Sequence, residues 1–293
     1  MLDYKLLDAL AAVVEQGGFE RGAQALGLTQ SAVSQRVKLL EARLGQPVLV
    51  RGNPPVPTAV GRQLLNHVQQ VRLLERDLGG QVPALDEAGT HRLRVALNAD
   101  SLATWWAEAV AAFCDERRVL LELVVEDQDV GLKRMRAGDV AGCVCAEPRP
   151  VAGAESVALG AMRYLGVASP AFVERHFKGG VSAERLFHAP AVIFGIDDRL
   201  QHRFAERLGV ADGFVHHVVP SSEGFVRMLE SGLGWGLVPA LQIRRALERG
   251  ALVEICPGEG VDVPLYWHSW RQGGKLLREL TTRLVREAGQ RLV

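Results

Sequence analysis

The chain has no long apolar run. Of its 293 residues, 48% are hydrophobic and 23% charged, yet no stretch approaches the roughly 20 apolar residues that a membrane-spanning helix needs. The first residues, Met1 to Lys5, also lack the basic and then apolar pattern of a secretory signal peptide. We therefore expect a cytoplasmic protein with no membrane contact, long enough for two or three folding units.

Cysteine is scarce and has no metal-ligand spacing. The four cysteines are Cys114, Cys143, Cys145 and Cys256, and their spacing matches no zinc site, so we expect neither a metal nor another cofactor. Cys143 and Cys145 lie in the apolar run 140–146, which is typical of a buried strand, and residues i and i+2 share one strand face. The two thiols are interpreted as small core residues in a reducing compartment, with a redox-sensing pair as the alternative.

Motifs of the common enzyme classes are missing as well. The glycines of segment 232–236 lack the spacing of a dinucleotide-binding loop, and the chain contains no Gly-x-Ser-x-Gly elbow and no phosphate-binding loop. His216 and His217 are adjacent, so on a strand they would point to opposite faces and could not chelate one metal. These absences predict that the protein is not an enzyme.

Net charge is zero, but basic residues are concentrated near the N-terminus. Between Arg21 and Arg62 the sequence has six basic residues and one acid, Glu41. A local basic footprint on a neutral protein favours a surface for double-stranded DNA at one end of the chain.

The first 45 residues have the spacing of a helix-turn-helix. Apolar residues at helical spacing predict a first helix that stops at Gly17–Gly18, followed by a short helix from about Phe19. Gly27 can adopt the left-handed conformation of a tight turn, and Thr29 is suited to cap the next helix, which we expect to run to about Leu44. A helix, a short glycine-containing turn and a second helix are the plan of this DNA-binding motif.

The second helix of this motif has an apolar face and a polar face. Its polar face carries no acid, unlike most solvated helix faces, and its short hydroxyls allow close approach to the major groove. Glutamine can contact adenine edges, and lysine can contact guanine or phosphate. We therefore expect DNA contacts from Thr29, Gln30, Ser31, Ser34, Gln35 and Lys38, the alternative being a merely solvated face.

A wing and a long helix follow. Residues 47–51 form a predicted short strand and residues 52–57 a proline-rich turn, which places Arg51 beside the phosphate backbone. After a cap at Thr58, apolar residues at alternating steps of three and four predict a helix that pairs with a second copy. The predicted dimer contacts are Leu64, Val68, Val71 and Leu78, although the same stripe could pack on its own domain.

The segment from Phe19 to Glu41 carries a family resemblance. Its Thr-Gln-Ser-Ala-Val-Ser element, Thr29 to Ser34, and the flanking Ala-Leu and Leu-Glu pairs resemble the DNA-binding domain of the LysR-type transcriptional regulators. The resemblance implies a winged helix-turn-helix, a dimerising linker helix and a two-lobed domain like the periplasmic binding proteins, crossed twice by the chain. The wing sequence differs from that of many family members, because this chain has Pro54 at a position where a second arginine is common.

Beyond residue 92 the predicted strands and helices alternate, among them a helix at 101–114 and a strand at 163–168. This alternation predicts an α/β domain with parallel sheets covered on both faces and, for this length, two lobes with a crevice between them. The expected units are a winged helix-turn-helix DNA-binding domain at 1–58, a dimerising linker helix at 59–78, a hinge at 79–91 and an effector-binding domain at 92–293. Within the effector-binding domain we expect lobe I at 92–160 and 266–293 and lobe II at 161–265.

Ligands of open α/β sheets bind beyond the carboxyl ends of the strands, where helix starts offer free amide donors. Two such junctions, 98–104 and 220–223, carry hydroxyls suited to hold a carboxylate, and a third strand ends in two acids. The candidate effector-binding residues are Asp100, Ser101, Thr104, Glu126, Asp127, Ser221, Ser222 and Glu223, the alternative being simple helix capping.

Several C-terminal segments, among them 98–105, 221–226 and 265–268, resemble the arginine/lysine-responsive branch of this family. The resemblance implies a regulator of basic-amino-acid export genes that is switched by lysine or arginine. Such an effector would place its α-carboxylate at Ser101 and Ser221–Ser222 and its cationic tail at Asp127, with Asp100 as the next candidate.

The partners that follow are double-stranded operator DNA, RNA polymerase and further copies of the chain in a homodimer or homotetramer. Two alternatives stay open for the signal, another small carboxylate and a redox change at Cys143 and Cys145. One alternative stays open for the function, a replication-origin-binding inhibitor, a role that has also been described for that branch. A structural nucleoid protein would need no domain of the periplasmic-binding type.

Overall fold

The computed structural model of the chain describes residues 2–50, 52–79, 91–125, 131–210 and 213–293. Arg51, Glu126 and Asp127, three of the predicted site residues, lie outside these ranges, as does the side chain of Leu78. Within them, no helix is both long enough and apolar enough to cross a membrane.

Three short helices form the N-terminal domain: α1 (Tyr4–Glu15), α2 (Phe19–Ala25) and α3 (Gln30–Leu44). The apolar stripes of α1 and α3 meet in one core that includes Leu7, Leu10, Val33 and Val37. Between α2 and α3 the backbone of Gly27 has φ +64°, which confirms the predicted left-handed turn.

A two-stranded wing follows α3. Strands β1 (Leu49–Val50) and β2 (Val56–Pro57) pair antiparallel. The carboxylate of Glu41 on α3 accepts a 3.0 Å hydrogen bond from the Val48 amide, so the helix holds the first strand of the wing in place.

The linker helix α4 (Ala59–Gly79) packs on α1 of its own domain. Val68 is only 2% exposed and belongs to the core that α1 and α3 form, and Leu64 packs partly against that core. Arg72 adds a 2.7 Å ion pair with Glu15. Val68 therefore cannot serve as a dimer contact as the sequence suggested, because its own domain already buries it; Val71 is half-buried and Leu74 is exposed.

The C-terminal domain is built on one curled, mixed sheet in the order β10-β6-β11-β5-β3-β4, with β9 also paired to β6. In this sheet β3, β4 and β5 run parallel to each other, whereas β6, β9, β10 and β11 pair antiparallel, so this sheet is mixed and not parallel as expected. The strand bounds are His91–Leu97 (β3), Val119–Val125 (β4), Gly142–Cys145 (β5), Ala154–Ala168 (β6), Gly236–Pro239 (β9), Val253–Glu254 (β10) and Val261–Trp270 (β11).

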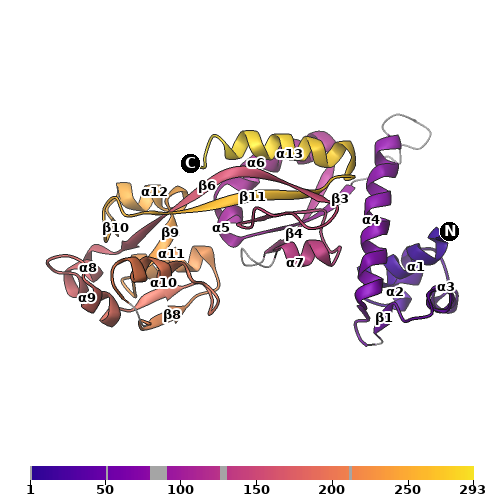
Figure 1. Cartoon of the computed structure of the whole chain (residues 1–293), viewed down its shortest axis with the longest axis horizontal. Helices are drawn as coiled ribbons and strands as arrows, with labels where there is room; N and C mark the ends of the chain where they lie inside the picture. Colours follow the sequence, from indigo (N-terminus) through magenta and orange to yellow (C-terminus); the bar gives the residue numbers. More distant parts are fainter. Residues whose placement is uncertain (1, 51, 80–90, 126–130, 211–212) are drawn as a thin grey trace.

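Two long strands join the lobes. β6 and β11 pair with each other from Ala154 opposite Trp270 to Tyr164 opposite Val261 and run through both halves of the domain (Figure 1). The sequence predicted β6 only from residue 163, because Glu155, Ser156 and Gly160 interrupt the apolar pattern of its first part.

Helices cover this sheet and define the two lobes. In lobe I, α6 (Ala107–Arg117) and α13 (Gly274–Ala288) lie on one face of the sheet and α7 (Gly131–Arg136) on the other (Figure 1). The predicted helix 101–114 is longer and is interrupted, since α5 (Ala99–Ser101) leads through a wide π-helical turn at Leu102–Trp106 into α6.

Lobe II lies at the far end of β6 from the DNA-binding domain (Figure 1). It has a second, two-stranded parallel sheet of β7 (Ala191–Ile193) and β8 (His216–Val218). Its helices are α8 (Pro170–His176), α9 (Ala183–His188), α10 (Leu200–Arg207), α11 (Ser222–Glu230) and α12 (Ala240–Glu248).

Candidate functional site

Helix α3 presents one polar face to solvent. The predicted contacts Thr29, Gln30, Ser31, Gln35 and Lys38 are exposed, and Ser34 is half-buried. The hydroxyl of Thr29 accepts a 3.2 Å hydrogen bond from the Ala32 amide, which confirms the predicted cap. Because the opposite face is buried in the domain core, the polar face is the one that can enter a DNA groove.

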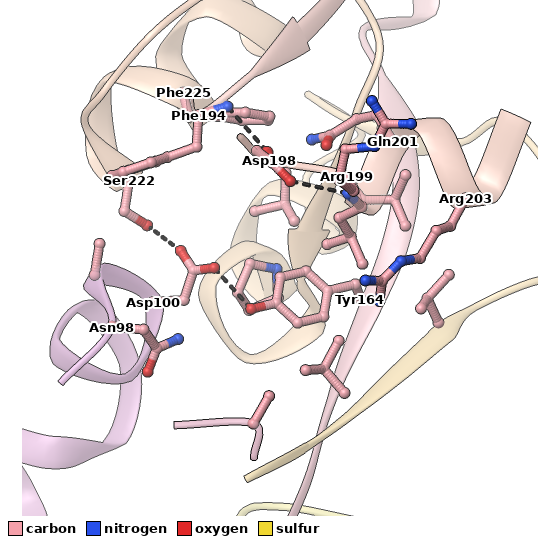
Figure 2. Close-up of a pocket in the computed structure, with 18 of the residues that line it drawn as sticks. Asn98, Asp100, Tyr164, Phe194, Asp198, Arg199, Gln201, Arg203, Ser222 and Phe225 are labelled. Atoms are coloured by element: carbon pink, nitrogen blue, oxygen red, sulfur yellow. Dashed lines mark hydrogen bonds between the residues drawn. The ribbon is translucent and has the colours of Figure 1, made fainter. Parts of the chain in front are cut away.

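The C-terminal domain contains a cavity of about 400 Å³ between its lobes (Figure 2). Lobe I contributes the end of β3 and the start of α5, lobe II contributes the segment that leads into α10 and the start of α11, and the crossing strands β6 and β11 form the floor. A volume of this size lies within the usual range of small-molecule pockets, roughly 300–1,000 Å³.

Asp100 joins three elements inside this cavity. Its carboxylate accepts a 2.7 Å hydrogen bond from the hydroxyl of Tyr164 on β6 and a 2.8 Å hydrogen bond from the hydroxyl of Ser222 on α11 (Figure 2). Hydrogen bonds donated to a carboxylate favour its charged form. The arrangement therefore holds the Asp100 carboxylate at a point where both lobes meet.

Gln242 on α12 supports this arrangement. Its amide nitrogen donates a 3.2 Å hydrogen bond to the carbonyl oxygen of Ser222, and its amide oxygen lies 3.1 Å from the Ser222 hydroxyl. A hydroxyl has one proton to donate, so Ser222 must divide it between Asp100 and Gln242. The hydroxyl can change partner without moving the backbone.

The described lining of the cavity carries an excess of acid. It includes five carboxylates, of Asp100, Glu147, Asp197, Asp198 and Asp262, and two guanidinium groups, of Arg199 and Arg203. This composition favours a ligand with more cationic than anionic groups.

Some of these acids already have structural roles. Asp198 accepts hydrogen bonds from the amides of Phe194 (3.0 Å) and Leu200 (2.9 Å) and so shapes the segment before α10. Asp262 pairs with Arg163 at 3.0 Å. Hydrogen bonds from the Arg149 amide and side chain lower the pKa of Glu147 and keep it ionised.

Of the six predicted effector residues that the structure describes, only Asp100 and Ser222 line the cavity. Ser101 is fully buried away from the lining, and the hydroxyl of Thr104 donates to the carbonyl oxygen of Asp100 at 2.6 Å. Ser221 caps α11 by accepting from the Gly224 amide at 3.1 Å. Glu223 is exposed outside the lining, and Glu126 and Asp127 lie outside the described residues.

The cavity lining also includes residues that the sequence did not indicate, namely Tyr164, Gln242 and most of the segment 194–201. The residues predicted from the sequence were mainly hydroxyls at helix starts, whereas Tyr164 lies in the middle of a strand and Gln242 inside a helix. Asp197 and Asp198 do follow a predicted strand, which is the signal that could have identified the segment.

None of the four cysteines lines the cavity. Cys143 and Cys145 on β5 are 0% and 1% exposed, and hydrogen bonding between the two thiols raises the pKa of Cys143 and lowers that of Cys145. The part of the chain that the structure describes contains no cluster of three or more His, Cys, Asp and Glu side chains placed to hold a metal ion.

Comparisons with known proteins agree with this architecture. Residues 4–62 match the family model "Bacterial regulatory helix-turn-helix protein, lysR family", and residues 86–290 match the "LysR substrate binding domain". The chain is 70% identical to the HTH-type transcriptional regulator ArgP of Pseudomonas fluorescens over 294 residues, covering 100% of this chain and 99% of that protein. It is 43% identical to the ArgP of Vibrio vulnificus (strain CMCP6), covering 98% and 97%.

Solved structures give the same result. The crystal structure of ArgP from Mycobacterium tuberculosis superposes with a TM-score of 0.88 at 37% identity, covering 100% of this chain and 99% of that one. Full-length LysG from Corynebacterium glutamicum, described as having bound effector Arg, superposes with a TM-score of 0.78 at 33% identity and covers 99% of both chains.

These relatives are named as transcriptional regulators and carry the same DNA-binding domain, so the chain is a regulator and not an enzyme. The match extends over both domains and nearly the full length of the relatives. The chain belongs to the LysR family of transcriptional regulators.

Proposed function

We propose that this regulator binds operator DNA through α3 and is controlled by free arginine or lysine in the cavity between its lobes. The observation that best supports a basic amino acid as the effector is the charge of the cavity lining. A basic amino acid has two cationic groups and one carboxylate. This complements the described lining, which keeps three acids and two arginines once the two acids paired with Arg163 and Arg149 are set aside. The 70% identical relative named ArgP and the arginine-bound LysG support the same ligand class.

Asp100 is the proposed partner for the α-ammonium group of the effector. It lies where both lobes meet, and its carboxylate is positioned by hydrogen bonds from Tyr164 and Ser222. The cationic tail would then extend toward Asp197 on lobe II, which lines the cavity and is exposed. This orientation replaces the carboxylate contacts expected at Ser101 and Ser221, because neither residue lines the cavity.

The DNA-binding half is proposed to act as a homodimer on a cytoplasmic operator that controls amino-acid export genes. Because Val68 is buried in its own domain, the dimer contact would involve Val71 and the exposed Leu74 of α4. Assembly to tetramers and contact with RNA polymerase are part of the same proposal.

Titration calorimetry with L-arginine and L-lysine tests the effector. Asp100→Asn removes the charge and keeps the shape, so we expect at least tenfold weaker binding, about 1.4 kcal/mol. Glu223→Gln is the matched control, since this acid lies one residue beyond Ser222 but outside the cavity lining, and it should leave affinity unchanged. A wild-type protein that binds neither amino acid would refute the proposed effector.

A further inference from the structure

Asn98 is a buried polar side chain without a partner. It is 3% exposed at the end of β3 and lines the cavity (Figure 2), yet neither its amide nitrogen nor its amide oxygen has a hydrogen-bond partner. It stands directly before α5 but does not cap it. Burying an unsatisfied amide is unfavourable, and each such group in a native protein calls for an explanation such as a bound ligand or water.

The chemistry of this side chain defines the group that would satisfy it. The amide offers one acceptor and two donor protons side by side. An α-amino acid presents the complementary pair on one carbon, a carboxylate that accepts and an ammonium that donates. An amine without the carboxylate could satisfy only the amide oxygen.

The place of Asn98 agrees with this chemistry. It lies two residues before Asp100 and lines the same cavity, so both side chains approach the ligand from lobe I. From lobe II, Gln201 also lines the cavity, is 1% exposed and has an amide oxygen without a partner. An acceptor on that side fits the donor-only cationic tail.

We propose that Asn98 is the residue that recognises the α-amino-acid end of the effector. Its amide nitrogen donates to the α-carboxylate, and its amide oxygen accepts from the α-ammonium group beside Asp100. This assignment rests on the proposed function and adds to it the reason why the cavity selects an amino acid over the corresponding amine.

The test compares arginine with agmatine, which is arginine without its carboxylate. Affinities are measured by calorimetry, with agmatine also measured by competition against arginine. We expect Asn98→Leu, of similar size, to reduce the preference for arginine over agmatine at least tenfold. Asn98→Asp keeps the acceptor and repels the carboxylate, so it should shift the preference further toward agmatine.

Gln201→Leu is the matched control. It also removes a buried amide oxygen without a partner, but at the tail end, so it should weaken arginine and agmatine by the same factor. Thermal melts establish that each variant is folded, and if Asn98→Leu is not, the isosteric Asn98→Asp decides alone. A variant at Asn98 that binds arginine with the wild-type preference overturns this assignment while the proposed function stands. A wild type that binds no basic amino acid overturns both.

Discussion

Gly138 lies against Asn66, and the contact joins the two domains of the chain. Gly138 ends the turn after α7 with φ +77°, and a Cβ atom on it would come within 2.3 Å of the Cβ of Asn66 on α4. The linker helix therefore packs directly on lobe I, as its position beside α7 in Figure 1 also shows. No residue larger than glycine fits at this point, so the two domains are in close contact here.

Gly138→Ala should weaken the coupling between effector and DNA. The new methyl group must displace α4, and the left-handed backbone adds about 1 kcal/mol of strain. Gly250→Ala has the same type of strain (φ +70°) but faces open space, so it isolates the effect of the clash. We expect arginine to bind Gly138→Ala normally by calorimetry but to change operator affinity less than in wild type. An unchanged effector response in gel shifts would show that this contact carries no signal.

A negative charge on the polar face of α3 should abolish operator binding. In Ser34→Glu and Gln35→Glu the carboxylate would be repelled by the DNA phosphates and would remove base contacts worth roughly 1–3 kcal/mol each. Ala171→Glu adds the same charge to an exposed position of α8, far from α3, and should have no effect. Gel shifts with folded variants decide the matter. Wild-type affinity in both α3 variants would mean that another face of the domain meets DNA.

Val68→Ala should destabilise the N-terminal domain by about 2 kcal/mol, because it leaves a cavity in a core where this side chain is 2% exposed. Val50→Ala makes the same change on the wing, where the side chain is 58% exposed, and should cost little. Denaturant unfolding of each variant gives both values. Equal stability of the two variants would place Val68 outside the core and return it to the dimer interface.

Thiol labelling should divide the cysteines into two classes. Burial raises the pKa of Cys114 and Cys256, so iodoacetamide should modify these half-buried thiols slowly at pH 7 and faster as the pH rises above the usual thiol range. Cys143 and Cys145 should stay unmodified until the protein unfolds, because they are almost fully buried. Mass spectrometry after native and denaturing labelling reports each site. Native modification of Cys143 or Cys145 would revive the redox alternative.

The sequence was most informative where structure is local. The bounds of α3 could be predicted because Thr29 and Gly45 each act on the helix end beside them and the apolar stripe repeats within a few residues. The cavity could not be predicted in this way, because its residues come from distant parts of the chain and meet only through the crossing of β6 and β11. They include Asp100, Tyr164, Ser222 and Gln242. A serine that caps a helix, such as Ser221, has the same sequence pattern as one that faces a ligand.

The path of β6 and β11 also determines the order in which the lobes can fold during synthesis. Strand β11 inserts between β5 and β6, so the sheet of lobe I is incomplete until residues 261–270 and the covering helix α13 have been made. Lobe II, which lies between these strands in the chain, emerges from the ribosome before β11 and can acquire its own core of Val192, Phe225 and Ile243. Lobe I must then wait, with β3, β4 and β5 unprotected, for roughly the last thirty residues of the chain. Mutations in α13 should therefore reduce the yield of folded protein more than equally buried changes within lobe II.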